Sequence, residues 1–247
     1  MNILDILFPK SCTICSKNGE YLCSRCKKLF KKTLPECYKC RRISPQYITH
    51  ERCKEKFTLD SVIVLWEYNE LSSVILKKYK YGSVYDAENT LLEFAKERLE
   101  EFVLNKKNKN SLTIPVPIST SRLRERGFNQ TEELAKVVSD TLGSMFDNSI
   151  VKKKGGDDIH QSLLDKEERE KHRSNFYIDD TDKLKDIKDI IIVDDVITTG
   201  STLEQISEVI KKVDNNISVK AVCLFRGRAY YTQSNKDDNS RKEKGGI

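Results

Sequence analysis

The sequence predicts an α/β fold in which a mostly parallel sheet is flanked by helices and preceded by a small cysteine-rich module. From residue 112 onward, short apolar segments alternate with segments of helical periodicity, as expected for successive βα units. Seven of the eight cysteines fall within the first 53 residues. We therefore expect the module at 1–58, the α/β domain at 59–231 and a charged, disordered tail at 232–247.

The spacing of apolar residues predicts the individual elements. β-branched and aromatic runs indicate strands, and apolar residues that recur every three to four positions indicate helices. A charged segment at 152–175 is long for a connection inside a domain, so we expect it to be mobile, as a functional lid or a disordered segment. The expected strands are 60–68, 112–116, 189–193 and 218–225, with a weak strand from 150, and the expected helices are 71–79, 91–103, 131–142 and 203–213.

The N-terminus lacks the features of a secretory signal. It has no basic region, Asp5 interrupts its apolar residues, and no small-residue cleavage site follows. No apolar stretch approaches the ~20 residues that span a bilayer. We expect a cytoplasmic protein without membrane insertion, whose reduced thiols bind metal more readily than they form disulfides.

Four ligand pairs, each with two residues between its members, make up the cysteine-rich module. Such spacing lets both side chains of a turn reach one metal ion, and eight ligands suffice for two structural Zn²⁺ sites, one Cys₄ and one Cys₃His. The alternatives are a disulfide framework and an iron–sulfur centre. The sequence is compatible with consecutive and with interleaved pairing. The expected ligands are Cys12, Cys15, Cys23, Cys26, Cys37, Cys40, His50 and Cys53.

Charge is distributed unevenly along the chain. Residues 1–56 contain 13 Lys and Arg against five Asp and Glu, a net charge of +8, whereas the other residues carry −2. Seven thiolates and two Zn²⁺ would lower the charge of the first segment to about +5, which still suits a polyanionic partner.

A buried strand ends in two adjacent carboxylates within the segment IIIVDDVITTGSTL at 190–203. After Asp194 and Asp195 the chain turns through small hydroxyl residues into an amphipathic helix. The N–H groups of a helix N-terminus can bind a phosphate, and two carboxylates can accept hydrogen bonds from vicinal ribose hydroxyls. A solvated turn with a Ser or Thr N-cap is the alternative. The expected phosphate-binding residues are Thr198, Thr199, Gly200, Ser201 and Thr202.

A second polar segment follows the earlier strand. Pro115-Val116-Pro117 predicts a rigid turn, and arginines then occupy alternate positions at Arg122, Arg124 and Arg126. Guanidinium groups bind phosphate oxygens in a bidentate manner, so this segment is a candidate pyrophosphate-binding loop. The alternative is a solvated basic turn ahead of a helix.

These segments together resemble one known family. The Pro-Val-Pro turn, RERGFNQ at 124–130, VDDVITTGST at 193–202 and the N-terminal Cys pairs are similar to the pattern of the competence protein F (ComF) family, over about residues 8–228. The resemblance implies a type I phosphoribosyltransferase fold, a zinc-binding N-terminus and a phosphoribosyl pyrophosphate (PRPP) ligand. It also implies a cytoplasmic role in transformable bacteria, in the handling of incoming single-stranded DNA together with DNA-uptake proteins.

Two functions fit these features. An enzyme of this type would be a phosphoribosyltransferase that holds Mg²⁺ with PRPP, with Asp194, Asp195 and Arg126 as catalytic residues and Arg124 beside Arg126 at the pyrophosphate. Its rate would come from electrostatic stabilisation, without a protein nucleophile. Fold alone does not decide that the chain is an enzyme.

The rival function is a non-catalytic nucleic-acid adaptor. It would hold a strand end or a nucleotide in the sugar-phosphate pocket, and the zinc module would contact the strand. Cations interspersed with aromatic side chains suit a single strand, because bases stack on aromatic rings. The aromatic residues are Tyr21, Phe30, Tyr38 and Tyr47, and the cations are Lys27, Lys28, Lys31, Lys32, Lys39, Arg41 and Arg42. The first four lysines are the expected phosphate contacts.

Overall fold

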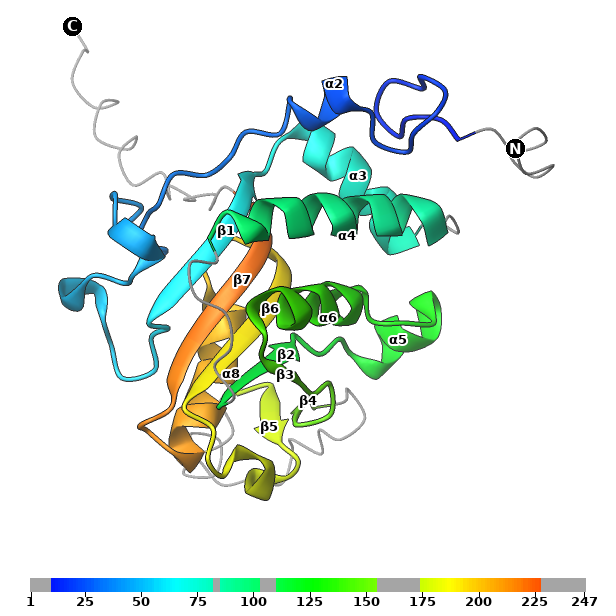
Figure 1. Ribbon diagram of the computed structural model, residues 1–247. Coiled ribbons are helices and arrows are strands. Elements are labelled where there is room, and N and C mark those ends of the chain that lie inside the picture. Colours follow the sequence, from blue (N-terminus) through cyan, green and yellow to red (C-terminus); the bar gives the residue numbers. More distant parts are fainter. Residues whose placement is uncertain (1–9, 82–84, 103–109, 155–173, 228–247) are drawn as a thin grey trace, which may run out of the picture.

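The computed structural model describes residues 10–81, 85–102, 110–154 and 174–227 (Figure 1). Most of the charged segment at 152–175 and the whole tail at 232–247 lie outside the described residues. The expected α/β fold is confirmed, because a parallel sheet runs through the domain with helices packed against it.

The central sheet has five strands in the order β1-β7-β6-β2-β3, and every neighbouring pair is parallel. Within this sheet, the neighbouring strands β6 and β7, of nine residues each, carry most of the buried apolar side chains. A separate antiparallel ribbon joins β4 to β5. The strands are β1 (Ser61–Glu67), β2 (Ser111–Pro115), β3 (Met145–Phe146), β4 (Val151–Lys153), β5 (Phe176–Ile178), β6 (Asp189–Ile197) and β7 (Ser218–Arg226).

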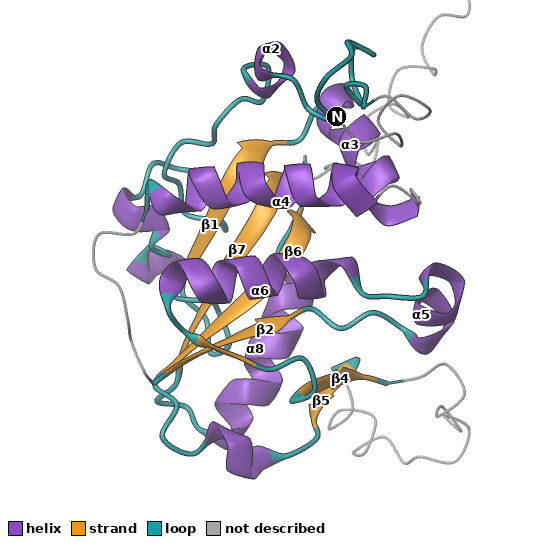
Figure 2. Ribbon diagram, turned by 45° about the vertical axis from the view of Figure 1, so that its right-hand side comes forward, coloured by secondary structure: helices purple, strands orange, loops and turns teal. Residues whose placement is uncertain are grey.

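Helices cover both faces of the sheet (Figure 2). α4 and α6 pack against one face, where Ile191 and Val193 of β6 point, and α8 packs against the other, where Ile190 and Ile192 point. Because side chains alternate along a strand, a strand that is covered on both faces is apolar throughout. The helices are α2 (Ser24–Lys27), α3 (Glu70–Tyr81), α4 (Tyr85–Glu100), α5 (Thr120–Arg126), α6 (Gln130–Leu142) and α8 (Ser201–Val213), with short 3₁₀ turns at Pro45–Tyr47, Glu51–Cys53 and Thr181–Leu184.

The cysteine-rich segment lies along the edge of the sheet at β1. The Glu67 N–H donates to the Lys31 carbonyl at 2.8 Å, and the Thr49 N–H donates to the Asp60 carbonyl at 2.8 Å, so both ends of the strand are paired with this segment. An uncovered edge strand would present unpaired backbone groups to other chains. The module therefore closes an edge that the α/β domain leaves open.

Aromatic side chains join the module to the sheet. Phe30 packs edge-on against Trp66 of β1, with ring centroids 5.9 Å apart, and against Phe94 of α4 at 5.6 Å. Trp66 stacks on Phe94 at 4.4 Å and lies 5.8 Å from Phe225 of β7. Phe30 and Trp66 are both almost fully buried, so part of the module's core is also the core of the domain.

The structure adds elements that the sequence analysis did not predict. β6 continues through both aspartates to Ile197, beyond the expected end at 193. The segment expected to be an arginine-bearing loop forms the short helix α5, whose N-cap Ser119 accepts a hydrogen bond from the Arg122 N–H. Within the described ranges, no helix is long and apolar enough to cross a membrane.

Candidate functional site

The two carboxylates predicted to bind ribose lie at the carboxyl end of β6. Asp194 and Asp195 are half-buried, and the Asp194 side chain accepts a hydrogen bond from the Asp195 N–H at 2.8 Å. Cys223 of the neighbouring strand β7 is the register partner of Asp194 and therefore lies beside it in the sheet. Complete burial, together with the charges of Asp194 and Asp195, raises the pKa of the Cys223 thiol, which therefore stays protonated at neutral pH.

The loop after β6 leads directly into α8 and brings the five predicted phosphate-binding residues together. Thr198, Thr199 and Ser201 are exposed, whereas Gly200 is buried. Gly200 is the N-cap of α8 and has φ 90°, a left-handed conformation that favours glycine. It supplies no capping side chain, in contrast to Ser119 at α5 and Asn129 at α6. Gly200 therefore offers no side-chain acceptor to the N–H groups of α8, and the Ser201 N–H donates to the neighbouring Thr199 hydroxyl at 3.3 Å.

The site coincides with a topological switch in the sheet. β2 and β6 are neighbours, with Pro115 opposite Val193. The connection after β2 leads to α6 on one face, and the connection after β6 leads to α8 on the other face (Figure 2). In open α/β sheets, ligands bind beyond the carboxyl ends of strands at such a point. The arginine-bearing segment and the loop at 198–202 thus leave the sheet side by side.

The predicted pyrophosphate-binding arginines lie on α5. Arg122 and Arg124 are exposed, and the Arg126 Nη1 donates to the Gln130 Oε1 at 3.2 Å. Positions four apart share a helix face, so Arg122 and Arg126 lie on one side of α5 and Arg124 lies on another. The arginines that occupy alternate positions in the sequence therefore do not all lie on one side of the segment.

The module also contacts the loop at 198–202, a contact that the sequence analysis missed. The Arg41 Nη2 donates to the carbonyls of Thr198 and Gly227, at 3.4 and 3.0 Å. The Tyr38 ring packs against Gly200, where an added Cβ would lie 2.8 Å from Tyr38 Cε2. In the sequence, Tyr38 lies within a Cys-x-x-Cys turn and Arg41 lies next to it. That position does not indicate a contact with the distant loop at 198–202.

Tyr38 and Lys39 both bind Glu204 in the first turn of α8. The Tyr38 hydroxyl donates to the Glu204 Oε1 at 2.6 Å, and the Lys39 Nζ lies 2.7 Å from the same oxygen. Burial and the neighbouring Glu204 raise the pKa of the Tyr38 hydroxyl, which remains a hydrogen-bond donor at neutral pH. Lys39 offsets the charge of Glu204 close to the proposed phosphate site.

The eight metal-ligand candidates form two separate groups. In each group, one potential ligand atom from every residue lies within 4.8 Å of those of the other three. The pairing is therefore consecutive, and the interleaved alternative is wrong. The groups are Cys12, Cys15, Cys23 and Cys26, called the first cysteine group, and Cys37, Cys40, His50 and Cys53, called the second cysteine group.

The local geometry of both groups fits tetrahedral zinc. Two thiolates on one zinc lie about 3.8 Å apart for Zn–S bonds of about 2.3 Å, and Cys15 Sγ and Cys23 Sγ are 3.7 Å apart. In the second cysteine group, His50 Nδ1 lies 3.3 Å from Cys40 Sγ, and His50 Nε2 lies 3.2 Å from the Ile43 carbonyl. An Nε2–H bond to that carbonyl would leave Nδ1 free to ligate a metal.

Backbone N–H donors lower the pKa of one cysteine in each group, Cys12 and Cys40. Burial alone would raise the pKa of Cys12, but N–H groups of Cys23, Cys15 and Ile14 outweigh it and lower the pKa to about 6. The Arg42 N–H is the main cause that lowers the pKa of Cys40 to about 7. Because thiolates are the metal-binding form, these donors favour metal coordination.

Much of the DNA-binding surface suggested by the sequence is occupied by other contacts. Phe30, Tyr38 and Tyr47 are buried, so their rings are not available for base stacking. Three of the four lysines form ion pairs with carboxylates of the α/β domain, whereas Lys28 is exposed and makes none of these pairs. The pairs are Lys27–Glu97, Lys31–Glu67 and Lys32–Glu101.

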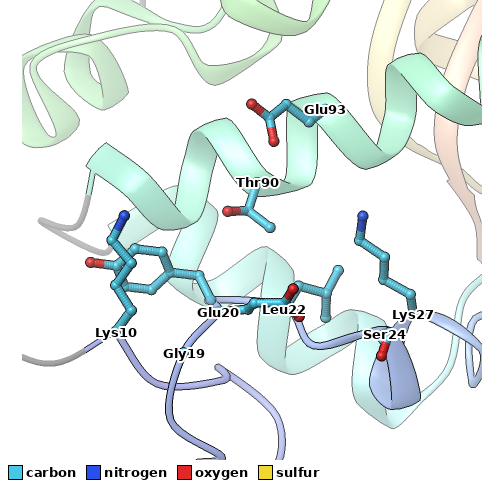
Figure 3. A pocket seen from close by; sticks show the side chains of 9 residues that line it. Lys10, Gly19, Glu20, Leu22, Ser24, Lys27, Thr90 and Glu93 are labelled. Atoms are coloured by element: carbon cyan, nitrogen blue, oxygen red, sulfur yellow. The ribbon is translucent and has the colours of Figure 1, made fainter. Parts of the chain in front are cut away.

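A pocket of about 270 Å³ lies between the first cysteine group and α4 (Figure 3). Lys10 and Lys27 line it together with Glu20 and Glu93, so its charges are mixed. Tyr21, the half-buried member of the four aromatic residues, is also in its wall. The pocket shares no lining residue with the loop at 198–202.

The sheet, the carboxylates at the end of β6 and the loop at 198–202 define a phosphoribosyltransferase-type domain. The family model described as "Phosphoribosyl transferase domain" matches residues 109–244. That match begins just before β2 and extends into the predicted tail. It includes Asp194, Asp195 and the loop.

Three curated relatives match most of the chain. Competence protein F of Haemophilus influenzae is 30% identical over 80% of this chain and 86% of its own length. Competence protein ComFC of Streptococcus pneumoniae is 24% identical over 90% of this chain and 94% of its own length. ComFC of Bacillus subtilis is 24% identical over 85% and 86%. The chain belongs to the competence protein F family, as the sequence motifs indicated.

The two cysteine groups predict a metal content that can be counted. The purified protein should contain two zinc ions per chain, because each group offers a complete tetrahedral ligand set. Cys15→Ser and Cys53→Ser should each reduce the content to one ion. Cys223→Ala, which removes a buried thiol outside both groups, should retain two. Elemental analysis that finds a single zinc in the parent protein, or bound iron, would contradict the assignment.

Proposed function

We propose that this chain binds PRPP, or a closely related phosphorylated ribose, at the carboxyl ends of β6 and β2. One observation carries the proposal. The half-buried carboxylates of Asp194 and Asp195 lie near the end of β6, and a short loop connects that strand to the N-terminus of α8, whose N-cap is Gly200. The location at a topological switch and the matching family model support it.

Each part of the site suits one part of the ligand. Asp194 and Asp195 would accept hydrogen bonds from the two ribose hydroxyls. The N–H groups and hydroxyls of residues 198–202 would bind the 5′-phosphate, since the α8 dipole favours an anion there. The α5 arginines, Arg124 and Arg126, would lie near the pyrophosphate, together with Mg²⁺ bound to the ligand.

Transfer of the phosphoribosyl group would require an acceptor but no protein nucleophile. A bond from the acceptor to C1 of the ribose would form as the C1–O bond to pyrophosphate breaks, and pyrophosphate would leave with the electron pair. The carboxylates and the arginines would stabilise positive charge at C1 and negative charge on the leaving group. Release of pyrophosphate that depends on an added acceptor is the measurement that identifies an enzyme.

The names of the relatives connect the family to competence. We propose that this protein acts in the cytoplasm, in the handling of single-stranded DNA during uptake. The exposed cations of the module and of α5 are the groups that would meet a strand, and a terminal sugar phosphate would enter the site. The adaptor hypothesis differs only in that no group is transferred.

The ligand proposal predicts the effect of removing both carboxylates. Asp194→Asn with Asp195→Asn should weaken binding of Mg²⁺–PRPP by at least about tenfold, since hydrogen bonds to charged groups contribute roughly 1.5–3 kcal/mol each. The folded protein should be as stable as the parent or more so, because two neighbouring negative charges are removed. Calorimetric titration and thermal unfolding provide the two measurements.

A charge-matched control separates a site effect from a net-charge effect. Asp140→Asn with Asp182→Asn removes two exposed carboxylates away from the loop and should leave PRPP affinity within about twofold of the parent. Unchanged PRPP affinity in the folded Asp194/Asp195 variant would rule out the assigned role of these carboxylates.

The ion pairs of the module lead to a prediction for DNA binding. Arg25, Lys28, Lys31 and Lys32 are all exposed, but Lys31 and Lys32 form ion pairs with Glu67 and Glu101. Arg25→Gln with Lys28→Gln should lower the salt dependence of single-strand binding by about 1.4 log units, or 0.7 for each phosphate contact. Lys31→Gln with Lys32→Gln is the matched control and should lower it by less than half as much. Equal changes in the two variants would contradict this assignment of the DNA-contacting surface.

A further inference from the structure

The second cysteine group lies directly against the proposed phosphoribosyl loop. Tyr38, between Cys37 and Cys40, is 2% exposed, and its ring occupies the space that a Cβ at Gly200 would need. Replacement of Gly200 by any other residue would strain the backbone and collide with this ring. Gly200 is therefore required by the close approach of Tyr38 as well as by the turn.

The other contacts of Tyr38 hold its ring in this position. Its hydroxyl donates to the Glu204 Oε1 at 2.6 Å and accepts from the Leu59 N–H at 3.3 Å. Its carbonyl accepts from the Arg226 Nη2 at 2.7 Å. Two elements, β7 and α8, and the segment that precedes β1 thus fix the same residue.

The turn that carries Tyr38 is built around metal ligands. The Arg41 N–H donates to the Cys37 carbonyl at 2.9 Å, and the Cys37 N–H donates to the Arg42 carbonyl at 2.9 Å. Arg41 has φ 61°, a conformation that non-glycine residues seldom adopt without support. A metal bound by Cys37 and Cys40 would hold the two ends of this turn at a fixed separation.

We propose that Tyr38 is a positioning residue through which the second cysteine group, when it holds its metal, sets the conformation of the phosphoribosyl loop. The inference rests on the proposed function, since it assigns regulation of the same ligand site. Arg41 acts with Tyr38, because its guanidinium binds the carbonyl of Thr198 at the start of the loop and that of Gly227 at the end of β7. Loss of the metal would free the Cys37–Cys40 turn, and Tyr38 would then be held only by its contacts with Glu204, Leu59 and Arg226.

The first cysteine group provides a contrast within the same chain. Cys12, Cys23 and Cys26 belong to the core on the α4 side of the sheet, whereas Tyr38 belongs to the core on the α8 side. Loss of the first metal should therefore lower stability without a specific effect on the loop.

The test compares two equally buried tyrosines of the module in the full-length protein. Tyr38→Leu removes the ring against Gly200. Tyr47→Leu removes a ring that is 3% exposed and packs against Phe102, just after α4. Tyr38→Phe keeps the ring but removes both hydroxyl contacts, so its behaviour should lie between those of the parent and Tyr38→Leu. Arg41→Gln tests the second contact at a more exposed position. Zinc content and thermal unfolding are measured for every variant.

Two readouts are needed. The first is the hydrogen-exchange rate of backbone amides at 198–202 without ligand, and the second is the affinity for Mg²⁺–PRPP. We expect Tyr38→Leu to retain two zinc ions, to speed exchange in this segment and to weaken PRPP binding by at least about tenfold. Arg41→Gln should shift both readouts in the same direction. Tyr47→Leu should leave both unchanged while lowering the unfolding temperature.

The outcomes separate this inference from the proposed function. Parent-like exchange at 198–202 in zinc-replete Tyr38→Leu and Arg41→Gln overturns the inference, even where PRPP binds to the parent. Absence of PRPP binding to the parent overturns the proposed function instead. In that event, faster exchange in Tyr38→Leu than in Tyr47→Leu still supports the structural coupling, and equal exchange in both removes it.

Discussion

The covering of the β1 edge by the cysteine-rich segment is the interaction on which the rest of the structure depends. β1 lies at the border of the parallel sheet, and the cysteine-rich segment pairs with both of its ends. Phe30 of that segment packs on Trp66, which in turn contacts α4 and β7. Each part therefore buries apolar surface that the other would leave exposed, and we expect the two to unfold together.

This arrangement places three cysteines of the first group in the core on the α4 side of the sheet and Tyr38, from the turn of the second group, in the core on the α8 side. The first packs against the α4 side, and the turn of the second lies against the loop that leads into α8. The second group of candidate metal ligands and the loop proposed to bind the phosphoribosyl ligand, which are distant motifs in the sequence, are thus adjacent in space. Tyr38 and Arg41 form the contact between them.

The sequence predicted what depends on local patterns. Apolar periodicity located β1, β2, β6, β7 and the main helices, and the x2 spacing identified the metal-ligand candidates. It could not choose between consecutive and interleaved pairing, because the path of the chain decides which turns meet. Nor could it show that Glu67 and Glu101 neutralise Lys31 and Lys32, or that Tyr38 is buried against Gly200, since these partners are distant in the chain.

Trp66 allows a direct test of the central claim that the module and the sheet form one folding unit. It is the only tryptophan of the chain, it is 1% exposed, and it lies between Phe30 and the sheet. Denaturant unfolding would be followed by Trp66 fluorescence and, in parallel, by zinc release to a chromogenic chelator. We predict coincident transitions with the same midpoint. Zinc release that is complete while Trp66 remains buried would contradict the claim, because the module would then unfold without the sheet.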